Sequence, residues 1–211
     1  MPYLLIEHLE DISEWLWLEY SHVAKWWNGK LVFTNVREDE RERLVKLGSV
    51  IGESVTRFPL DRSKVIVLDL QAGEELKPED IDEDTVIVLG GILGDAVPRG
   101  RTREFVTSRM KGVTVRHIGK PQYSIDGASI VAKLIADGRR LDEIEYEENP
   151  TIKLDEFSEI TLHYAVPKLD GKILLTPGLI ELQREEMGYT ETDDGISDEE
   201  LEAFFEGRGG L

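Results

Sequence analysis

One carboxylate and two arginines follow a glycine turn at the end of an apolar stretch, where they could bind a small charged ligand. Residues 86–89 are apolar and mostly β-branched, and two glycines come directly after them. Asp95, Arg99 and Arg101 follow soon after. In open α/β sheets, ligands bind at the carboxyl ends of such strands, where the chain turns. We therefore expect a ligand site at the end of this strand.

A second candidate is Glu19, which lies inside the apolar stripe of a helix predicted over residues 12–27. Trp15, Leu16 and Val23 are its neighbours at helical spacing. A carboxylate on an apolar face must find partners or take a raised pKa. Glu19 is therefore a candidate acid or base that faces a pocket, and the alternative is a boundary residue that pairs with an arginine.

Three buried strands are predicted to position these groups, and they end at residues 70, 91 and 118. Helices are predicted between and after them, over residues 102–110 and 127–136, the second with Asp126 as its N-cap. Alternating strands and helices indicate an α/β fold with a mostly parallel sheet. None of the three turns carries a Gly-x-Gly-x-x-Gly or a Gly-Lys-Ser/Thr motif. An adenine or a sulfonium compound, held by several backbone segments, fits this pattern better than a triphosphate.

The remainder of the chain predicts a smaller appendage. Residues 160–164 and 172–175 read as antiparallel strands joined by an Asp170-Gly171 turn. Helices are expected over residues 179–187 and 198–205. We therefore divide the chain into a core, residues 1–139, and a C-terminal extension with short antiparallel strands and an acidic helical tail, residues 140–211.

Composition excludes several classes of protein. The 211 residues include no cysteine, so disulfides, thiolate chemistry and cysteine-based metal sites are absent. No apolar run approaches the ~18 residues of a membrane span, and a signal peptide is not recognisable. The four histidines show no ligand spacing, so we expect no metal. These features favour a cytoplasmic protein that has no membrane partner.

The formal net charge of −18 is unfavourable for a protein whose main partner is nucleic acid. The distribution is uneven, because residues 99–116 hold six basic side chains against one acid. Residues 181–206 hold eleven acids against one arginine. A basic strip beside an acidic tail indicates a small anionic site ringed by surfaces that attract cations.

Several short motifs resemble the SPOUT methyltransferase family, in the branch that includes the eukaryotic protein-arginine methyltransferase of a small-subunit ribosomal protein. The resemblance extends to about residue 187. It rests on Gly90-Gly91-Ile92-Leu93-Gly94-Asp95, Pro98-Arg99, Arg101-Thr102, Ile6-Glu7-His8, Glu14-Trp15, Glu19-Tyr20, Gln71-Ala72, the Gln122-Ser124-Asp126 loop, Asp170-Gly171-Lys172 and Thr176-Pro177-Gly178.

The resemblance implies a deep trefoil knot on the C-terminal side of the core, with S-adenosylmethionine bent within it. The cofactor contacts that it implies are Leu70, Gln71, Ala72, Leu89, Gly90, Gly91, Gly94, Ile118, Gly119, Tyr123, Ser124 and Asp126. We expect Glu19, Asp95 and Glu7 to orient an acceptor arginine and take its proton. We expect Arg99, Arg101, His8 and Tyr20 to contact the substrate. The resemblance also favours a monomer over a homodimer.

Three functions are compatible with this sequence. The first is methyl transfer to an arginine of a basic, ribosomal protein, which the branch resemblance and the acidic surface favour. The second is methylation of tRNA or rRNA, because most relatives of the wider fold modify RNA and the basic strip could hold phosphate. The third is a catalytically inactive interaction module that kept the fold.

Overall fold

The computed structural model describes residues 1–92 and 100–188. Its centre is a six-stranded sheet in the order β3-β2-β1-β5-β4-β6, and every neighbouring pair is parallel. The predicted α/β class with a mostly parallel sheet is therefore confirmed. The strands are β1 (Tyr3–His8), β2 (Leu31–Thr34), β3 (Ser49–Val50), β4 (Val65–Leu68), β5 (Val86–Gly91) and β6 (Thr114–Arg116).

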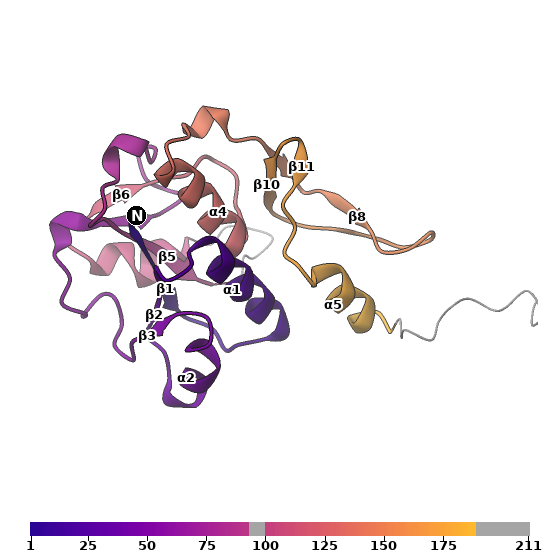
Figure 1. Cartoon of the computed structure of the whole chain (residues 1–211), viewed down its shortest axis with the longest axis horizontal. Helices are drawn as coiled ribbons and strands as arrows, with labels where there is room; N and C mark the ends of the chain where they lie inside the picture. The colour runs from indigo at the N-terminus through magenta and orange to yellow at the C-terminus, as the bar shows by residue number, and fades with distance from the viewer. Residues whose placement is uncertain (93–99, 189–211) are drawn as a thin grey trace, which may run out of the picture.

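Helices cover both faces of this sheet (Figure 1). The helices on the sheet include α1 (Glu14–Trp26), α2 (Glu38–Leu44), α3 (Arg101–Phe105) and α4 (Ile125–Ala136). A further helix, α5 (Leu179–Glu186), packs on α1 instead, and the 3-10 turns are η1 (Arg62–Lys64), η2 (Pro78–Asp80), η3 (Thr107–Arg109) and η4 (Leu141–Glu143). The apolar stripes of α1 and α4 pack on one face, in a core that includes Leu4, Ile6 and Tyr20. Val55 and Val106 pack on the other face, so β1, β4 and β5 are apolar on both sides.

Two of the predicted helices differ from the observed ones. The prediction of Asp126 as an N-cap is wrong, because the Ser124 Oγ accepts the cap bond from the Gly127 N–H at 3.2 Å. Asp126 instead lies inside α4 with its side chain buried. The helix predicted over residues 102–110 is divided into the short helix α3 and the 3-10 turn η3, which meet at Val106, whose side chain is fully buried.

The C-terminal extension forms two small sheets rather than the predicted hairpin. Its strands are β7 (Tyr146–Glu148), β8 (Thr151–Lys153), β9 (Glu159–Thr161), β10 (Ala165–Leu169) and β11 (Lys172–Ile173), ordered β11-β10-β7 and β8-β9. The Asp170-Gly171 turn exists, but it joins β10 to β11, and β9 pairs with β8 instead. The predicted pairing of residues 160–164 with residues 172–175 is therefore wrong. The strand β10 was not predicted because it contains Pro167, which has no N–H to donate and is unusual inside a strand.

The extension packs beside α1 and α4 (Figure 1) through its own apolar cluster. Ile152, Leu162, Val166 and Leu179 form the buried part of this cluster, and Trp15 of α1 packs against it. The helix predicted over residues 198–205 lies outside the described residues. Within the described residues, no helix is both long enough and apolar enough to cross a membrane.

Candidate functional site

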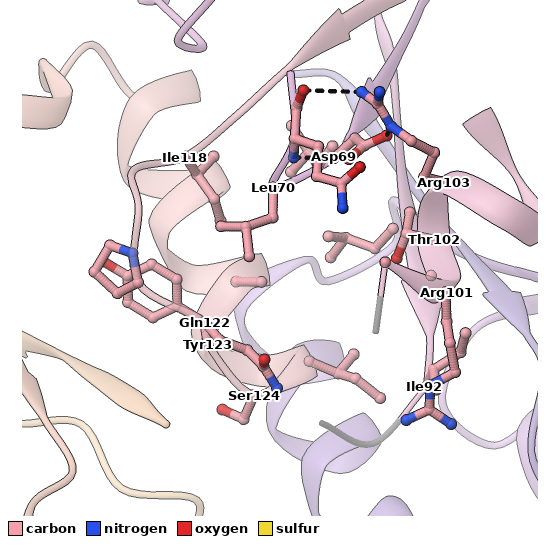
Figure 2. A pocket seen from close by; sticks show the side chains of 18 residues that line it. Asp69, Leu70, Ile92, Arg101, Thr102, Arg103, Ile118, Gln122, Tyr123 and Ser124 are labelled. Atoms are coloured by element: carbon pink, nitrogen blue, oxygen red, sulfur yellow. Dashed lines mark hydrogen bonds and ion pairs between the residues drawn. The ribbon is translucent and has the colours of Figure 1, made fainter. Parts of the chain in front are cut away.

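A cavity lies where the loops after β4, β5 and β6 come together (Figure 2). Its volume of about 170 Å³ is more than ten times the roughly 10–15 Å³ that one water molecule needs, so it has room for an organic ligand. The lining residues are Leu68, Asp69, Leu70, Gln71, Leu89, Gly90, Ile92, Gly100, Arg101, Thr102, Arg103, Ile118, Pro121, Gln122, Tyr123, Ser124, Ile125 and Ala128.

Close approach of the backbone shapes the wall at the end of β5. A Cβ built on Gly90 would lie 2.7 Å from the Thr102 Oγ1, closer than real Cβ contacts come, so only glycine fits there without a shift. Apolar side chains of Leu70 and Ile118 face this wall across the cavity (Figure 2). A mostly apolar lining with a few polar groups is typical of a small-molecule site.

A buried carboxylate orders the loop after β4. Asp69 is 4% exposed, and its Oδ1 accepts a bond from the Gln71 N–H at 2.8 Å while its Oδ2 accepts one from the Arg103 Nε at 3.0 Å. Arg103 also donates to the Gln71 carbonyl at 2.9 Å. Arg101 in turn donates to Glu10 at 2.8 Å. Both arginine charges at the cavity are thus offset by carboxylates of the same chain.

Glu19, on the inner face of α1, is buried and is not among the residues that line the cavity, but it contacts one that is. Its carboxylate accepts a bond from the indole N–H of Trp15 at 2.8 Å and one from the backbone N–H of Ile125, a lining residue, also at 2.8 Å. Burial, and then the nearby charge of Asp126, raise the pKa of Glu19 from its usual 4.5 to about 8. A carboxyl group tuned close to neutral pH suits an acid or base.

Asp126 is the centre of a buried hydrogen-bond network. Its Oδ2 accepts bonds from His22 Nδ1 at 2.8 Å and from the Thr176 hydroxyl at 2.7 Å, and its Oδ1 accepts bonds from the Ser124 hydroxyl and the Gly127 N–H. The indole of Trp26, which can only donate, bonds His22 Nε2, so the proton of that imidazole sits on Nδ1. Asp126 thus joins α1, α4 and the extension.

The second predicted catalytic carboxylate, Glu7, holds neighbouring loops together. It accepts bonds from the Ser54 hydroxyl at 2.5 Å, the Thr34 hydroxyl at 2.6 Å and the Val55 N–H at 2.9 Å. It is not among the residues that line the cavity. Its contacts assign it a role in fixing the segment after β3, and its catalytic role stays a prediction.

His8 and Tyr20, both predicted to contact substrate, are buried. His8 Nδ1 is bonded to the Tyr20 hydroxyl at 3.0 Å and His8 Nε2 to Glu40 at 3.1 Å. The Tyr20 hydroxyl supports Gly91, where an added Cβ would approach it to 2.5 Å. Neither side chain lines the cavity.

The structure brings together a large part of the predicted cofactor site. Ala72, Gly91, Gly119 and Asp126 lie nearby but outside the cavity lining, and Gly94, Asp95 and Arg99 lie outside the described residues. The predicted residues that line the cavity are Leu70, Gln71, Leu89, Gly90, Ile118, Tyr123, Ser124 and, from the substrate set, Arg101.

The residues that sequence reasoning missed include Asp69, His22 and Thr176. Asp69 directly follows the buried strand β4, a placement that could have identified it. His22 and Thr176 gave no local signal, because they meet Asp126 across 104 and 50 residues of sequence. Among the described residues, no group of three or more potential ligands could hold a metal ion.

Comparisons with known proteins identify the family of this chain. The family described as "Protein arginine N-methyltransferase SFM1-like" matches residues 3–190. The protein arginine N-methyltransferase SFM1 of Saccharomyces cerevisiae is 30% identical over 208 residues, which cover 90% of this chain and 97% of that protein.

Solved structures show the same fold. The crystal structure of yeast SFM1 complexed with SAM has a TM-score of 0.80 at 27% identity, covering 89% of this chain and 92% of that chain. A dual-specific Trm10 from Thermococcus kodakaraensis has a TM-score of 0.50 at 20% identity, covering 67% of this chain and 96% of that chain, a likeness of fold alone. By its sequence match, which takes in nearly the whole chain, this protein belongs to the SFM1-like family of protein arginine N-methyltransferases.

Proposed function

We propose that this chain transfers a methyl group from S-adenosylmethionine to an arginine side chain of a basic protein. The observation that carries the proposal is the buried Glu19–Asp126 pair at the edge of the cavity. The cavity could hold the cofactor, and the two carboxylates could attract the positively charged guanidinium group of an acceptor arginine. Family membership, and the SAM complex of the yeast relative, support the same assignment.

The residues present fit an adenosyl ligand. Leu70, Leu89 and Ile118 offer apolar contacts, Gln71 and Ser124 offer polar ones, and Gly90 lets the backbone come close. When bound, S-adenosylmethionine supplies an electrophilic methyl group, whose transfer forms a nitrogen–carbon bond, breaks the sulfur–carbon bond and releases one proton from the acceptor nitrogen. The trefoil knot implied by the resemblance stays a prediction.

Glu19 would receive the released proton. An arginine acceptor carries its positive charge throughout the physiological pH range, so a carboxylate must orient it. In the free protein, the pKa of Glu19 of about 8 keeps much of this group protonated at neutral pH. A guanidinium nearby favours the charged form, so acceptor binding ionises Glu19 and leaves a carboxylate ready to accept a proton.

The charge of the protein favours a protein acceptor over RNA. A net charge of −18 repels phosphate and attracts a basic partner such as a ribosomal protein. The two arginines that could hold phosphate at the cavity are instead paired, Arg101 with Glu10 and Arg103 with Asp69. We therefore place RNA methylation second.

The test is incubation with methyl-labelled S-adenosylmethionine and either separated ribosomal proteins or tRNA and rRNA. We expect label in one or a few basic proteins, and acid hydrolysis should recover it as methylarginine. Label in RNA alone would replace this proposal with the second candidate. Cofactor binding by calorimetry without transfer to either pool would favour an inactive module.

We also propose that the protein acts as a monomer, and that it is cytoplasmic, as its lack of cysteine favours. Support comes from the extension, whose apolar cluster packs against Trp15 and covers part of α1. Light scattering after size-exclusion chromatography should give the mass of one chain at micromolar concentration. A mass of two chains would contradict the monomer and leave the assigned chemistry unchanged.

A further inference from the structure

The hydroxyl of Tyr164 is buried and has no hydrogen-bond partner among the described residues. No other side-chain nitrogen or oxygen in the described part of the chain shares this condition. Burying a hydroxyl without a partner costs free energy, because its bonds to water are lost and nothing replaces them. An unpaired buried group therefore calls for an explanation, and a ligand that supplies the partner is one.

The backbone holds Tyr164 beside the cavity wall. The next residue, Ala165, donates its N–H to the Gln122 carbonyl at 2.7 Å and forms a bridge with Tyr123, and both of these residues line the cavity. Asn149 donates to the Tyr164 carbonyl at 3.2 Å. The position of Tyr164 is thus fixed from both sides by ordered backbone.

The side chain of Tyr164 belongs to the same environment as Glu19. It packs in the apolar cluster of the extension with Trp15, whose indole donates to Glu19. Burial, followed by the charges of Glu19 and Asp126, raises the pKa of Tyr164, so this hydroxyl keeps its proton and lies within electrostatic reach of both carboxylates.

We propose that the Tyr164 hydroxyl and the Glu19 carboxylate together bind the guanidinium group of the acceptor, and that Tyr164 is a specificity-determining residue supplied by the extension. This inference rests on the proposed function and names a new residue of the same site. Asp126 already accepts four hydrogen bonds, so it contributes negative charge rather than a direct contact.

The chemistry favours arginine over lysine. A guanidinium has five N–H donors spread over a plane, so it can reach a carboxylate and a hydroxyl oxygen at the same time. An ammonium concentrates three donors on one nitrogen and matches this arrangement less well. The Tyr164 hydroxyl would then favour a planar guanidinium group over an ammonium group.

The variant Tyr164→Phe removes one oxygen and keeps the ring. We expect kcat/KM for an arginine acceptor to fall by about 10- to 100-fold, as for a lost hydrogen bond to a charged group, while the affinity for S-adenosylmethionine stays unchanged by calorimetry. The unfolding midpoint should stay the same or rise, because the variant also removes an unpaired buried hydroxyl. Tyr3→Phe, at the exposed start of β1, is the matched control and should leave all three quantities unchanged.

A binding measurement separates this inference from the proposed function. Methylguanidinium chloride, titrated into the cofactor-free protein, should shift NMR signals of the site in the wild type and should bind more weakly to Tyr164→Phe. Methylammonium chloride should bind weakly to both the wild type and Tyr164→Phe. Methylguanidinium binding that depends on Tyr164, without methyl transfer to any protein, would remove the proposed function and keep the guanidinium site. Equal binding by the wild type and Tyr164→Phe, or none by the wild type, would overturn the role of Tyr164.

Discussion

The core and the extension differ in how they are held together and in what they give to the site. In residues 1–139, six parallel strands of two to six residues form one sheet, which buries apolar side chains on both of its faces. In residues 140–188, strands of two to five residues bury one small cluster, which Trp15 of α1 completes. We therefore expect the extension to depend on contact with the core.

The two regions also divide the site between them. Every residue that lines the cavity belongs to the core. The extension instead reaches the polar network beside the cavity, through Thr176 on Asp126 and through the unpaired hydroxyl of Tyr164. The division suggests that cofactor binding and acceptor binding can be separated by mutation.

Glu19→Gln is the sharpest test of this separation. The variant keeps the size of the side chain and removes its charge, so the cavity should still bind S-adenosylmethionine with nearly unchanged affinity. Methyl transfer should fall by ~10²-fold or more, because the acceptor loses its carboxylate and its proton acceptor. Calorimetry and single-turnover transfer measure the two quantities.

The control for Glu19→Gln is Glu14→Gln, on the exposed face of the same helix, where the carboxylate pairs with Arg43. It should leave both affinity and rate unchanged. Full turnover by Glu19→Gln would remove Glu19 from the mechanism, and loss of cofactor binding would show that the two functions are not separable at this position.

Asp126→Asn tests the network that joins the two regions. An amide can accept bonds only at its oxygen, so two of the four donors around Asp126 would lose their acceptor in either orientation of the side chain. We expect the free energy of unfolding in urea to fall by roughly 2–3 kcal/mol. Asp137→Asn, at an exposed pair with Lys133, should cost much less. Equal losses in the two variants would mean that the network does not stabilise the fold.

The raised pKa of Glu19 predicts a dependence of stability on pH. Between about 4.5 and 8, the folded protein keeps a proton that the unfolded chain has released. Unfolding therefore releases a proton in this window, and the free energy of unfolding should fall as pH rises, by up to about 1.4 kcal/mol per pH unit. Urea titrations at pH 5, 6, 7 and 8 should show this slope in the wild type. In Glu19→Gln, the slope should be smaller, and identical slopes would contradict the raised pKa.

The sequence predicted the core well because its signals are local. The apolar runs of β4 and β5 can only be buried strands, and their glycine and acidic endings mark the carboxyl edge where the cavity lies. Glu19 was singled out because it is a carboxylate among Trp15, Leu16 and Val23 on an apolar face, although pairing with an arginine was the alternative. The parallel arrangement of the strands predicts only that these loops lie at the same edge of the sheet, and not which loops are neighbours.

The extension and the polar network were predicted poorly because their partners are distant. Each of β8 and β9 has one inward residue, Ile152 and Ile160, which is too little pattern to fix a register. Asp126 precedes a helical pattern as an N-cap residue does, but in the structure its carboxylate is buried and accepts hydrogen bonds from His22 and Thr176, which are distant in the sequence. Burial of Tyr164 follows from the same long-range packing.

The smallest expected effect on the free energy of unfolding is at Phe157, in the extension. It is 95% exposed at the tip of the β8–β9 hairpin, whose turn is held by Asp155 Oδ1 accepting the N–H groups of Phe157 and Ser158 at 2.6 and 2.7 Å. Because these bonds are to the backbone, Phe157→Ser should change the free energy of unfolding by less than about 0.5 kcal/mol. Ile152→Ala, at the buried position of the same hairpin, should cost about 2 kcal/mol or more. If urea denaturation gave the same loss of unfolding free energy for Phe157→Ser as for Ile152→Ala, the tip of the hairpin would have to pack against the rest of the chain. The extension would then be stabilised by more contacts than those of its small apolar cluster.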